Sequence, residues 1–190
     1  MLNLPNALTL LRFVLVPVIG LQLLRGNFGL AGVLFLVSAL SDWADGMIAR
    51  HWNQRTRFGA VADPLADKLT TLTVTLLLAF QQALPWWFAL AVVLRDAVIV
   101  AGALAFHLLI RPVEMAPSRL SKLNTALEFL LLLAVLAIQA GHLPDGLWRS
   151  ALLAATLGTI VLSGGHYVYV WGRKAAAPRQ PPKTAGHDHG

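Results

Sequence analysis

The chain has 190 residues, of which 57% are hydrophobic and only 13% are charged, and its mean hydropathy is +0.66. A soluble domain carries about a quarter charged residues, so this composition argues against a soluble fold and predicts one membrane-embedded body. The net charge of +6 is then expected to contact anionic headgroups, and no nucleic-acid partner is expected. Cysteine is missing from the sequence, which excludes disulfides and thiolate metal ligands.

Six apolar segments follow one another along the chain, each close to the roughly 20 residues that a membrane-spanning helix needs. They cover residues 6–24, 29–50, 60–81, 86–109, 121–140 and 147–171. Strands are not expected, because an open sheet edge cannot persist in lipid. We therefore expect an all-α integral membrane protein with six transmembrane helices over residues 1–174. The Pro-rich, polar residues 175–190 are expected to form a disordered cytoplasmic tail.

Basic residues predict the orientation of these segments. An even number of spans puts both termini on one side, and most of the lysines and arginines in the linkers fall on that same side. They are Arg50, Arg55, Arg57, Arg111, Arg119, Lys122, Arg173, Lys174, Arg179 and Lys183. The opposite side offers mainly Arg25 and Arg149. The positive-inside rule therefore predicts cytoplasmic termini.

Four aspartates lie between residues 42 and 67, where the second apolar segment ends and the third begins. A carboxylate in or beside a hydrocarbon segment costs several kcal/mol, so it usually has a function. Helical spacing gives two faces, with Asp42, Asp45, Gly46 and Ala49 on one and Gly59, Asp63 and Asp67 on the other. These faces would meet at the cytoplasmic end of the bundle, and the bare Gly and Ala positions would allow a helix or a ligand to approach closely.

Four facing carboxylates would repel one another unless cations neutralised them. Arg50 and Lys68 are the only close candidates for cationic partners, too few for four carboxylates, so a site for a hard divalent cation (Mg²⁺, Mn²⁺ or Ca²⁺) is the first interpretation. A proton or ion relay in a transporter and simple packing are the alternatives. Asp63 followed by Pro64 also matches the start of a helix, with the aspartate as its cap.

Residues 42–67, DWADGMIARHWNQRTRFGAVADPLAD, fit the pattern D-x2-D-G-x2-A-R-x8-G-x3-D-x3-D at every fixed position. The stretch resembles the signature of the CDP-alcohol phosphatidyltransferases. The resemblance implies six transmembrane helices, a homodimer and a metal site open to the cytoplasm. It also implies transfer of a phosphatidyl group from a CDP-linked lipid to an alcohol, with release of CMP.

The resemblance assigns roles to individual residues. Asp42, Asp45, Asp63 and Asp67 would form a site for two divalent cations, Mg²⁺ or Mn²⁺, with Asp67 as the general base. The donor lipid would contact Asn6, Thr9, Arg12, Asp42, Gly46, Ala49, Arg50 and Gly59. For Asn6 and Thr9 the alternative is hydrogen bonding within their own helix, and for Arg50 it is anchoring at the membrane surface.

Two further stretches bear on the acceptor alcohol. Arg95–Asp96 and the segment MAPSRLSKLNTALEF (residues 115–129) resemble the CMP-forming cardiolipin synthases within this family more than its glycerophosphate-using members. Glu128 departs from that pattern, which has a glutamine there. Arg95, Arg119 and Lys122 are the candidates for binding acceptor phosphate, and membrane anchoring is their alternative role.

The resemblance therefore implies CDP-diacylglycerol as donor and phosphatidylglycerol, an anionic phospholipid, as acceptor, in a bacterial cytoplasmic membrane. Glycerol 3-phosphate is the alternative acceptor. A non-enzymatic cation or proton transporter is the alternative from outside the enzyme class.

Overall fold

The computed structural model describes residues 4–51, 57–109 and 119–176, although some side chains near the helix ends are not described. Within these ranges the chain forms six helices and no strand. They are α1 (Leu4–Leu24), α2 (Phe28–His51), α3 (Arg57–Phe80), α4 (Trp86–Leu109), α5 (Arg119–Gln139) and α6 (Leu147–Ala176). The all-α prediction is confirmed for this part of the chain.

The predicted segments agree with the helices to within a few residues, apart from α6, which continues to Ala176 instead of ending near residue 171. The helix start predicted at Asp63 and Pro64 is wrong. The helix begins at Arg57, so both residues lie inside α3. A proline inside a helix removes one backbone hydrogen bond. Two residues before this proline, Ala62 is 6% exposed, so the helix is already packed against its neighbours at that point.

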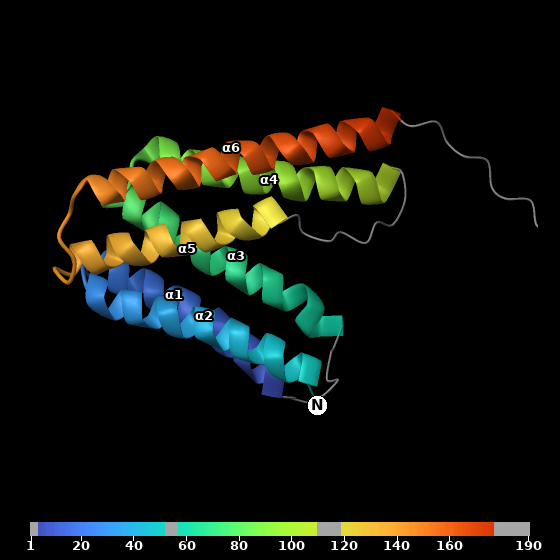
Figure 1. Cartoon of the computed structure of the whole chain (residues 1–190). Coiled ribbons are helices and arrows are strands. Elements are labelled where there is room, and N and C mark those ends of the chain that lie inside the picture. Colours follow the sequence, from blue (N-terminus) through green and yellow to red (C-terminus); the bar gives the residue numbers. More distant parts are fainter. Residues whose placement is uncertain (1–3, 52–56, 110–118, 177–190) are drawn as a thin grey trace, which may run out of the picture.

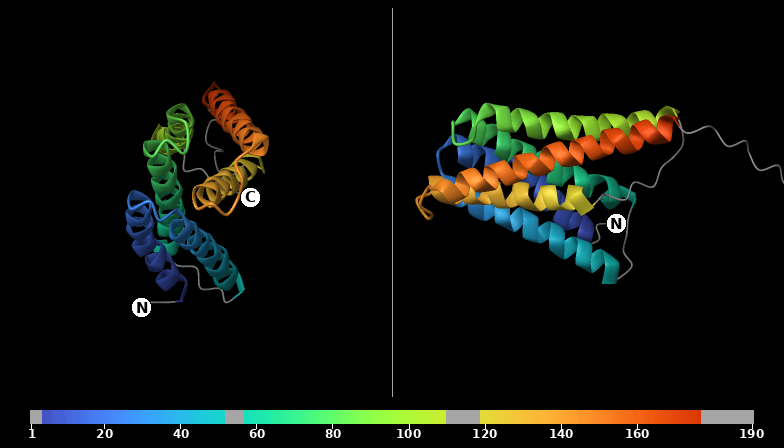
Figure 2. Two further views of the ribbon diagram at one scale, coloured as in Figure 1. Left: turned by 90° about the vertical axis from the view of Figure 1, so that its left-hand side faces the viewer. Right: turned by 45° about the horizontal axis from the view of Figure 1, so that its top comes forward.

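The helices form one bundle in which α1 and α2 lie side by side, with α4 and α6 on the other side (Figure 1). The helices α3 and α5 run between these pairs, and the end-on view in Figure 2 shows the same arrangement. The chain passes up and down through the bundle, so α1, α3 and α5 begin at the end where α2, α4 and α6 finish (Figure 1). All four aspartates belong to that end of α2 and α3.

The opposite end holds short connections that pin neighbouring helices together. Gly26 and Gly141 adopt φ values of +76° and +75°, a left-handed conformation that glycine tolerates and that lets the chain reverse quickly. Gln81 Nε2 donates a hydrogen bond to the carbonyl of Leu23. Arg149 donates to the Ala83 carbonyl at 2.5 Å and pairs with Asp145 at 2.7 Å. These contacts join the three helical hairpins at this end.

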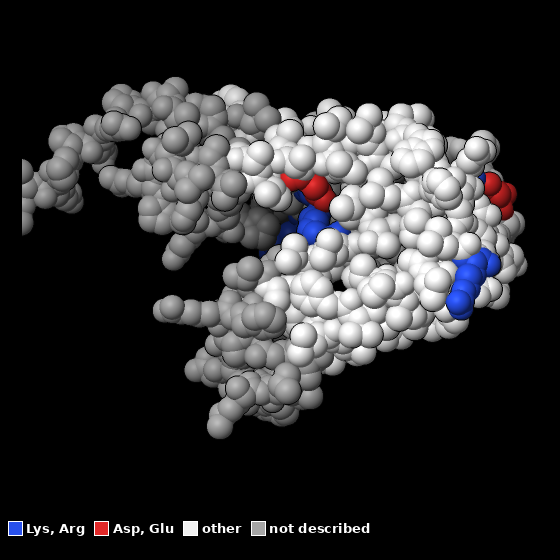
Figure 3. Space-filling model, turned by 180° about the vertical axis from the view of Figure 1, so that it is seen from behind, with Lys and Arg blue, Asp and Glu red and all other residues white. Residues whose placement is uncertain are grey.

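The interior of the bundle has an apolar core, but its exterior differs from that of a water-soluble bundle. Large apolar residues such as Leu90, Leu94 and Val161 are more than half exposed, whereas Arg12 and Arg95 are buried. Figure 3 shows a largely uncharged exterior with a few charged side chains in a hollow and at the far end. Wide apolar exteriors are typical of proteins that contact lipid or partners.

Two segments in the described part of the chain, Leu120–Gln139 and Leu147–Tyr167, are both long and apolar enough to cross a membrane. Two shorter apolar segments are Leu8–Leu24 and Phe28–Asp42. In α2 the apolar segment ends at Asp42, the first residue of the acidic stretch.

Candidate active site

Asp42, Asp63 and Asp67 come together from two helices at the same end of the bundle. Asp42 belongs to the later half of α2, and Asp63 and Asp67 lie about one turn apart near the start of α3. The side chains of Asp42 and Asp63 are 45% and 34% exposed. Asp45 lies on α2, but its side chain is outside the described part of the structure.

Arg12 on α1 joins these two helices. Its Nη1 donates to Oδ1 of Asp42, and its Nη2 donates to Oδ1 of Asp63 at 3.0 Å. Thr9, one turn earlier on α1, donates its hydroxyl to the same Asp63 oxygen at 2.5 Å. Arg12 and Thr9 are 1% and 0% exposed. One helix therefore provides a buried cation and a hydroxyl that hold carboxylates of the next two helices.

These contacts correct part of the sequence interpretation. Arg50 and Lys68 were expected to be the only close cationic partners of the aspartates, yet among the described side chains it is Arg12 that contacts Asp42 and Asp63. The expectation was wrong because Arg12 is distant along the chain and reaches the aspartates only when α1 packs against α2 and α3. Lys68 instead pairs with Asp96 on α4, at 2.8 Å.

A cavity of about 670 Å³ opens beside the carboxylates. Its polar wall includes Arg12, Asp42, Asp67 and Lys122, which brings a cation of α5 to the acidic side chains. The remaining lining residues are Phe35, Ser38, Ala39, Thr70, Thr71, Thr125, Ala126 and Phe129. The cavity thus has a charged part with carboxylates and cations, next to an apolar wall. Such a site suits a ligand with a charged headgroup and an apolar body.

The described residues offer the donors that a hard divalent cation prefers. Asp42 and Asp63 contact one guanidinium and therefore face a common point, while Asp67 lines the adjoining cavity. No group of three His, Cys, Asp or Glu side chains within the described set is close enough to hold a metal ion by itself. Carboxylate oxygens are the ligands of Mg²⁺ and Mn²⁺, so the donor chemistry fits. A complete site would need Asp45 in addition.

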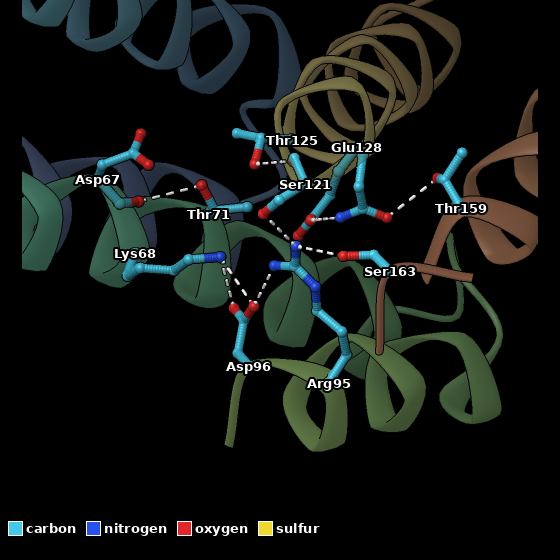
Figure 4. Close-up of polar contacts among 11 residues, drawn as sticks. Asp67, Lys68, Thr71, Arg95, Asp96, Ser121, Thr125, Glu128, Thr159 and Ser163 are labelled. Atoms are coloured by element: carbon cyan, nitrogen blue, oxygen red, sulfur yellow. Dashed lines mark hydrogen bonds and ion pairs between the residues drawn. The ribbon is translucent and has the colours of Figure 1, made fainter. Parts of the chain in front are cut away.

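A second polar cluster surrounds Arg95 of α4, which is 6% exposed (Figure 4). Its Nη1 pairs with Asp96 at 2.7 Å, and Asp96 also pairs with Lys68 of α3. Its Nη2 donates to Ser121 of α5 at 2.9 Å and to Ser163 of α6 at 3.2 Å. Arg95 was predicted to bind acceptor phosphate. In the structure its guanidinium is engaged by protein groups, so a phosphate would have to displace some of them.

Glu128 of α5 extends this cluster into the interior. It is 2% exposed, and its Oε2 accepts a hydrogen bond from Asn124 at 3.4 Å. Thr159 of α6 donates in turn to Asn124 at 3.0 Å. The sequence contained a signal for these residues, because Ser121, Asn124 and Glu128 have the spacing of one helix face. Sequence reasoning assigned no structural role to Ser121, Asn124, Thr159 or Ser163.

The remaining predicted site residues divide into two groups. Lys122 is exposed and lines the cavity. Asn6, Gly46, Ala49, Arg50, Gly59 and Arg119 lie within helices, but their side chains are outside the described part of the structure. Asp67 lines the cavity, and Figure 4 shows its carboxylate directed away from Lys68 and the Arg95 cluster.

The amino-acid sequence that forms this bundle matches a known family. A family model described as CDP-alcohol phosphatidyltransferase matches residues 2–162. The chain belongs to this family and is therefore a phosphotransferase. The non-enzymatic transporter that the carboxylates alone left open is set aside.

Individual relatives carry two different enzyme names. A Mycobacterium tuberculosis protein named "Putative cardiolipin synthase" is 35% identical over 195 residues, covering 99% of this chain and 90% of the relative. The human "Cardiolipin synthase (CMP-forming)" is 30% identical over 188 residues, covering 90% of this chain and 62% of the relative. The Escherichia coli K12 "CDP-diacylglycerol--glycerol-3-phosphate 3-phosphatidyltransferase" is 39% identical over 106 residues, covering 52% of this chain and 57% of the relative.

Proposed function

We propose that the chain is a CMP-forming cardiolipin synthase, which transfers the phosphatidyl group of CDP-diacylglycerol to phosphatidylglycerol. The observation that carries this proposal is the cavity that Asp42, Asp67 and Lys122 line together with apolar side chains. An anionic phospholipid headgroup would meet a cation there, and its chains would meet apolar side chains. The two cardiolipin synthase relatives above align with 90% or more of this chain, which supports the same acceptor.

The reaction forms one P–O bond and breaks another. The free hydroxyl of the phosphatidylglycerol headgroup attacks the phosphorus that carries diacylglycerol, and the bond from that phosphorus to the CMP oxygen breaks. Asp67 takes the hydroxyl proton as general base, which its position on the cavity wall would allow. The products are cardiolipin and CMP. Lys122 would hold the phosphate of the acceptor while the hydroxyl approaches.

Asp42, Asp45 and Asp63, with Asp67 beside them, would hold two divalent cations, Mg²⁺ or Mn²⁺. When bound, the cations would neutralise the pyrophosphate and stabilise the CMP leaving group. The residues of the chain set the geometry. Asp42 and Asp63 are already held together by α1, and Asp67 stands on the next turn of α3 with its carboxylate facing the cavity.

We also propose that all six helices span a bacterial cytoplasmic membrane with cytoplasmic termini, and that the enzyme is a homodimer. The exposed apolar side chains and the exposed Trp86, Trp87 and Trp148 at the end opposite the aspartates support this arrangement. CMP would then leave into the cytoplasm, while both lipids enter from the bilayer.

Glycerol 3-phosphate is the second candidate acceptor. The E. coli relative named for that substrate is 39% identical over the shared half of the chain, a higher identity over a shorter alignment. The two acceptors share a phosphate and a free hydroxyl, so the charged part of the cavity alone suits both.

One assay separates these possibilities. Purified protein is supplied with labelled CDP-diacylglycerol, Mg²⁺ or Mn²⁺, and each acceptor in turn, and CMP release is measured. We expect release with phosphatidylglycerol. Release with glycerol 3-phosphate alone would overturn the proposed acceptor, and no release with any alcohol would overturn the proposed activity.

A further inference from the structure

Arg12 is a buried cation whose described partners are carboxylates on two other helices. It is 1% exposed, it lies on α1, and it contacts Asp42 of α2 and Asp63 of α3. A charge removed from water in this way must be matched by an opposite charge. Its partners are far less buried, at 45% and 34% exposure, so they retain surface toward the cavity end.

We propose that Arg12 is a resident counter-ion of the acidic site, which holds Asp42 and Asp63 together in the absence of a divalent cation. The inference rests on the proposed metal site, because it concerns how that site exists before metal binds. Arg12 acts through the two aspartates, so it is a positioning residue and not a catalytic one.

The charges show why these carboxylates need a counter-ion and why Arg12 neutralises them only in part. Two carboxylates that face a common point repel each other, and one guanidinium between them turns this repulsion into attraction to a shared cation. Thr9 adds an uncharged donor to the Asp63 oxygen that Arg12 also contacts. Even with Lys122 on the cavity wall, two described cations, Arg12 and Lys122, face three described carboxylates, those of Asp42, Asp63 and Asp67. The site therefore stays negative and attractive to a further cation.

This role differs from the donor-phosphate contact that the sequence suggested for Arg12. Both terminal nitrogens of the guanidinium already donate to carboxylate oxygens. A phosphate at the same nitrogens would have to compete with two negative groups that the fold holds in place. The contacts therefore favour a role for Arg12 in positioning the two aspartates over a role in binding the donor phosphate.

The test compares Arg12→Met, which removes the charge, with Arg12→Lys, which keeps it. The matched control is Arg149→Met, which removes an arginine that joins helices at the opposite end of the bundle. Each full-length protein is purified in detergent and stripped of metal. Its thermal unfolding midpoint, Tm, is then measured without metal and with Mn²⁺ alone, and Mn²⁺ binding is followed by the spectroscopic signal of the free ion.

We expect Arg12→Met to lower the metal-free Tm by about 5–15 °C, and Mn²⁺ to raise its Tm at least about twofold more than that of the unmodified protein. Arg12→Lys should keep most of the metal-free Tm. Arg149→Met should lower the Tm without changing the Mn²⁺-induced rise. Mn²⁺ should bind Arg12→Met at least as tightly as the unmodified protein, because a competing positive charge is gone.

An unchanged Mn²⁺-induced rise in Arg12→Met would overturn the proposal. If Arg12→Met does not fold under any condition, the double variant Arg12→Met/Asp63→Asn decides. Recovery of a folded, metal-free protein supports the counter-ion role, because the unmatched carboxylate is gone, and failure to recover refutes it. None of these measurements uses substrate, so a failure of the proposed reaction would appear separately, as absent CMP release by the unmodified protein.

Discussion

Arg12 and Arg95 are both nearly inaccessible, and each binds side chains of neighbouring helices, yet their surroundings differ in charge. Arg12 joins α1, α2 and α3 and is outnumbered by carboxylates. Arg95 joins α4, α5 and α6 and, through Asp96 and Lys68, also α3. Its cluster contains two cationic residues, Arg95 and Lys68, and two acidic residues, Asp96 and Glu128 (Figure 4).

This difference indicates that buried charge has two different roles in one bundle. In the balanced cluster the charges are matched within the protein, although Arg95 Nε and Glu128 Oε1 are buried without a hydrogen-bond partner, so the cluster can join helices and carries no net charge to attract a ligand. An unbalanced cluster keeps a residual charge, so it attracts a cation and the anionic groups that cations bind. We therefore interpret the Arg12 cluster as part of the candidate active site and the Arg95 cluster as a structural support for it.

Asp67→Asn should remove the proposed general base and leave the fold intact. The carboxylate lines the cavity and points away from the Arg95 cluster, so its loss breaks no support. We expect CMP release to fall by about 10²–10⁴-fold, the usual contribution of a general base, with Tm nearly unchanged. Turnover assays together with thermal unfolding check both parts. A variant that remains fully active would show that another group takes the proton.

Arg95→Met should have the opposite profile. It leaves Asp96 and the hydroxyls of Ser121 and Ser163 without their shared donor. Breaking a buried ion pair costs about 3–5 kcal/mol, so we expect a Tm lower by about 10 °C or more. The Mn²⁺-induced rise in Tm should equal that of the unmodified protein.

The conservative variant Arg95→Lys separates support from acceptor binding. It keeps the charge but cannot donate to Asp96, Ser121 and Ser163 in the same planar fork. If Arg95 only supports the fold, the Arg95→Lys protein should be less stable than the unmodified protein by about 1–2 kcal/mol, and its KM for the acceptor should be unchanged. A raised acceptor KM with unchanged Tm would restore Arg95 to the role of phosphate ligand that the sequence suggested.

Lys122→Met tests the proposal that Lys122 binds the acceptor phosphate in the candidate active site. Lys122 is exposed and lines the cavity, so its loss should not change Tm. We expect the KM for phosphatidylglycerol to rise by about tenfold, corresponding to about 1.4 kcal/mol, with a smaller effect on the KM for CDP-diacylglycerol. Initial-rate kinetics with each lipid varied in turn measure both. An equal rise in KM for both lipids would show that Lys122 does not distinguish the acceptor from the donor.

Glu128→Gln should have the smallest effect. The described contact of Glu128 is a long hydrogen bond from Asn124, and a glutamine oxygen can accept the same bond. We expect a change in unfolding free energy within about 1 kcal/mol and no change in the response to Mn²⁺. A large change in the Mn²⁺ response would show that the two clusters act as one electrostatic unit.

Much of the fold was predictable because it is local. The length of each apolar run determines a membrane-sized helix, and the helix bounds followed to within a few residues for most elements. The exception at Asp63 and Pro64 is instructive. Local turn chemistry predicted a helix start, whereas α3 begins at Arg57 and Ala62, upstream of the proline, is buried.

The spacing of Asp42, Asp63 and Asp67 is likewise a property of the sequence alone, since helical periodicity assigns residues to a face before any packing is known. The pairing of each cation with its carboxylate is not determined by the sequence alone. Arg12 lies 30 residues from Asp42, and Arg95 lies 68 residues from Ser163, so only the packing of the helices brings these groups together. The sequence therefore determined the helices and the acidic faces. The tertiary structure alone decided that one buried arginine meets an excess of negative charge and the other a balanced cluster.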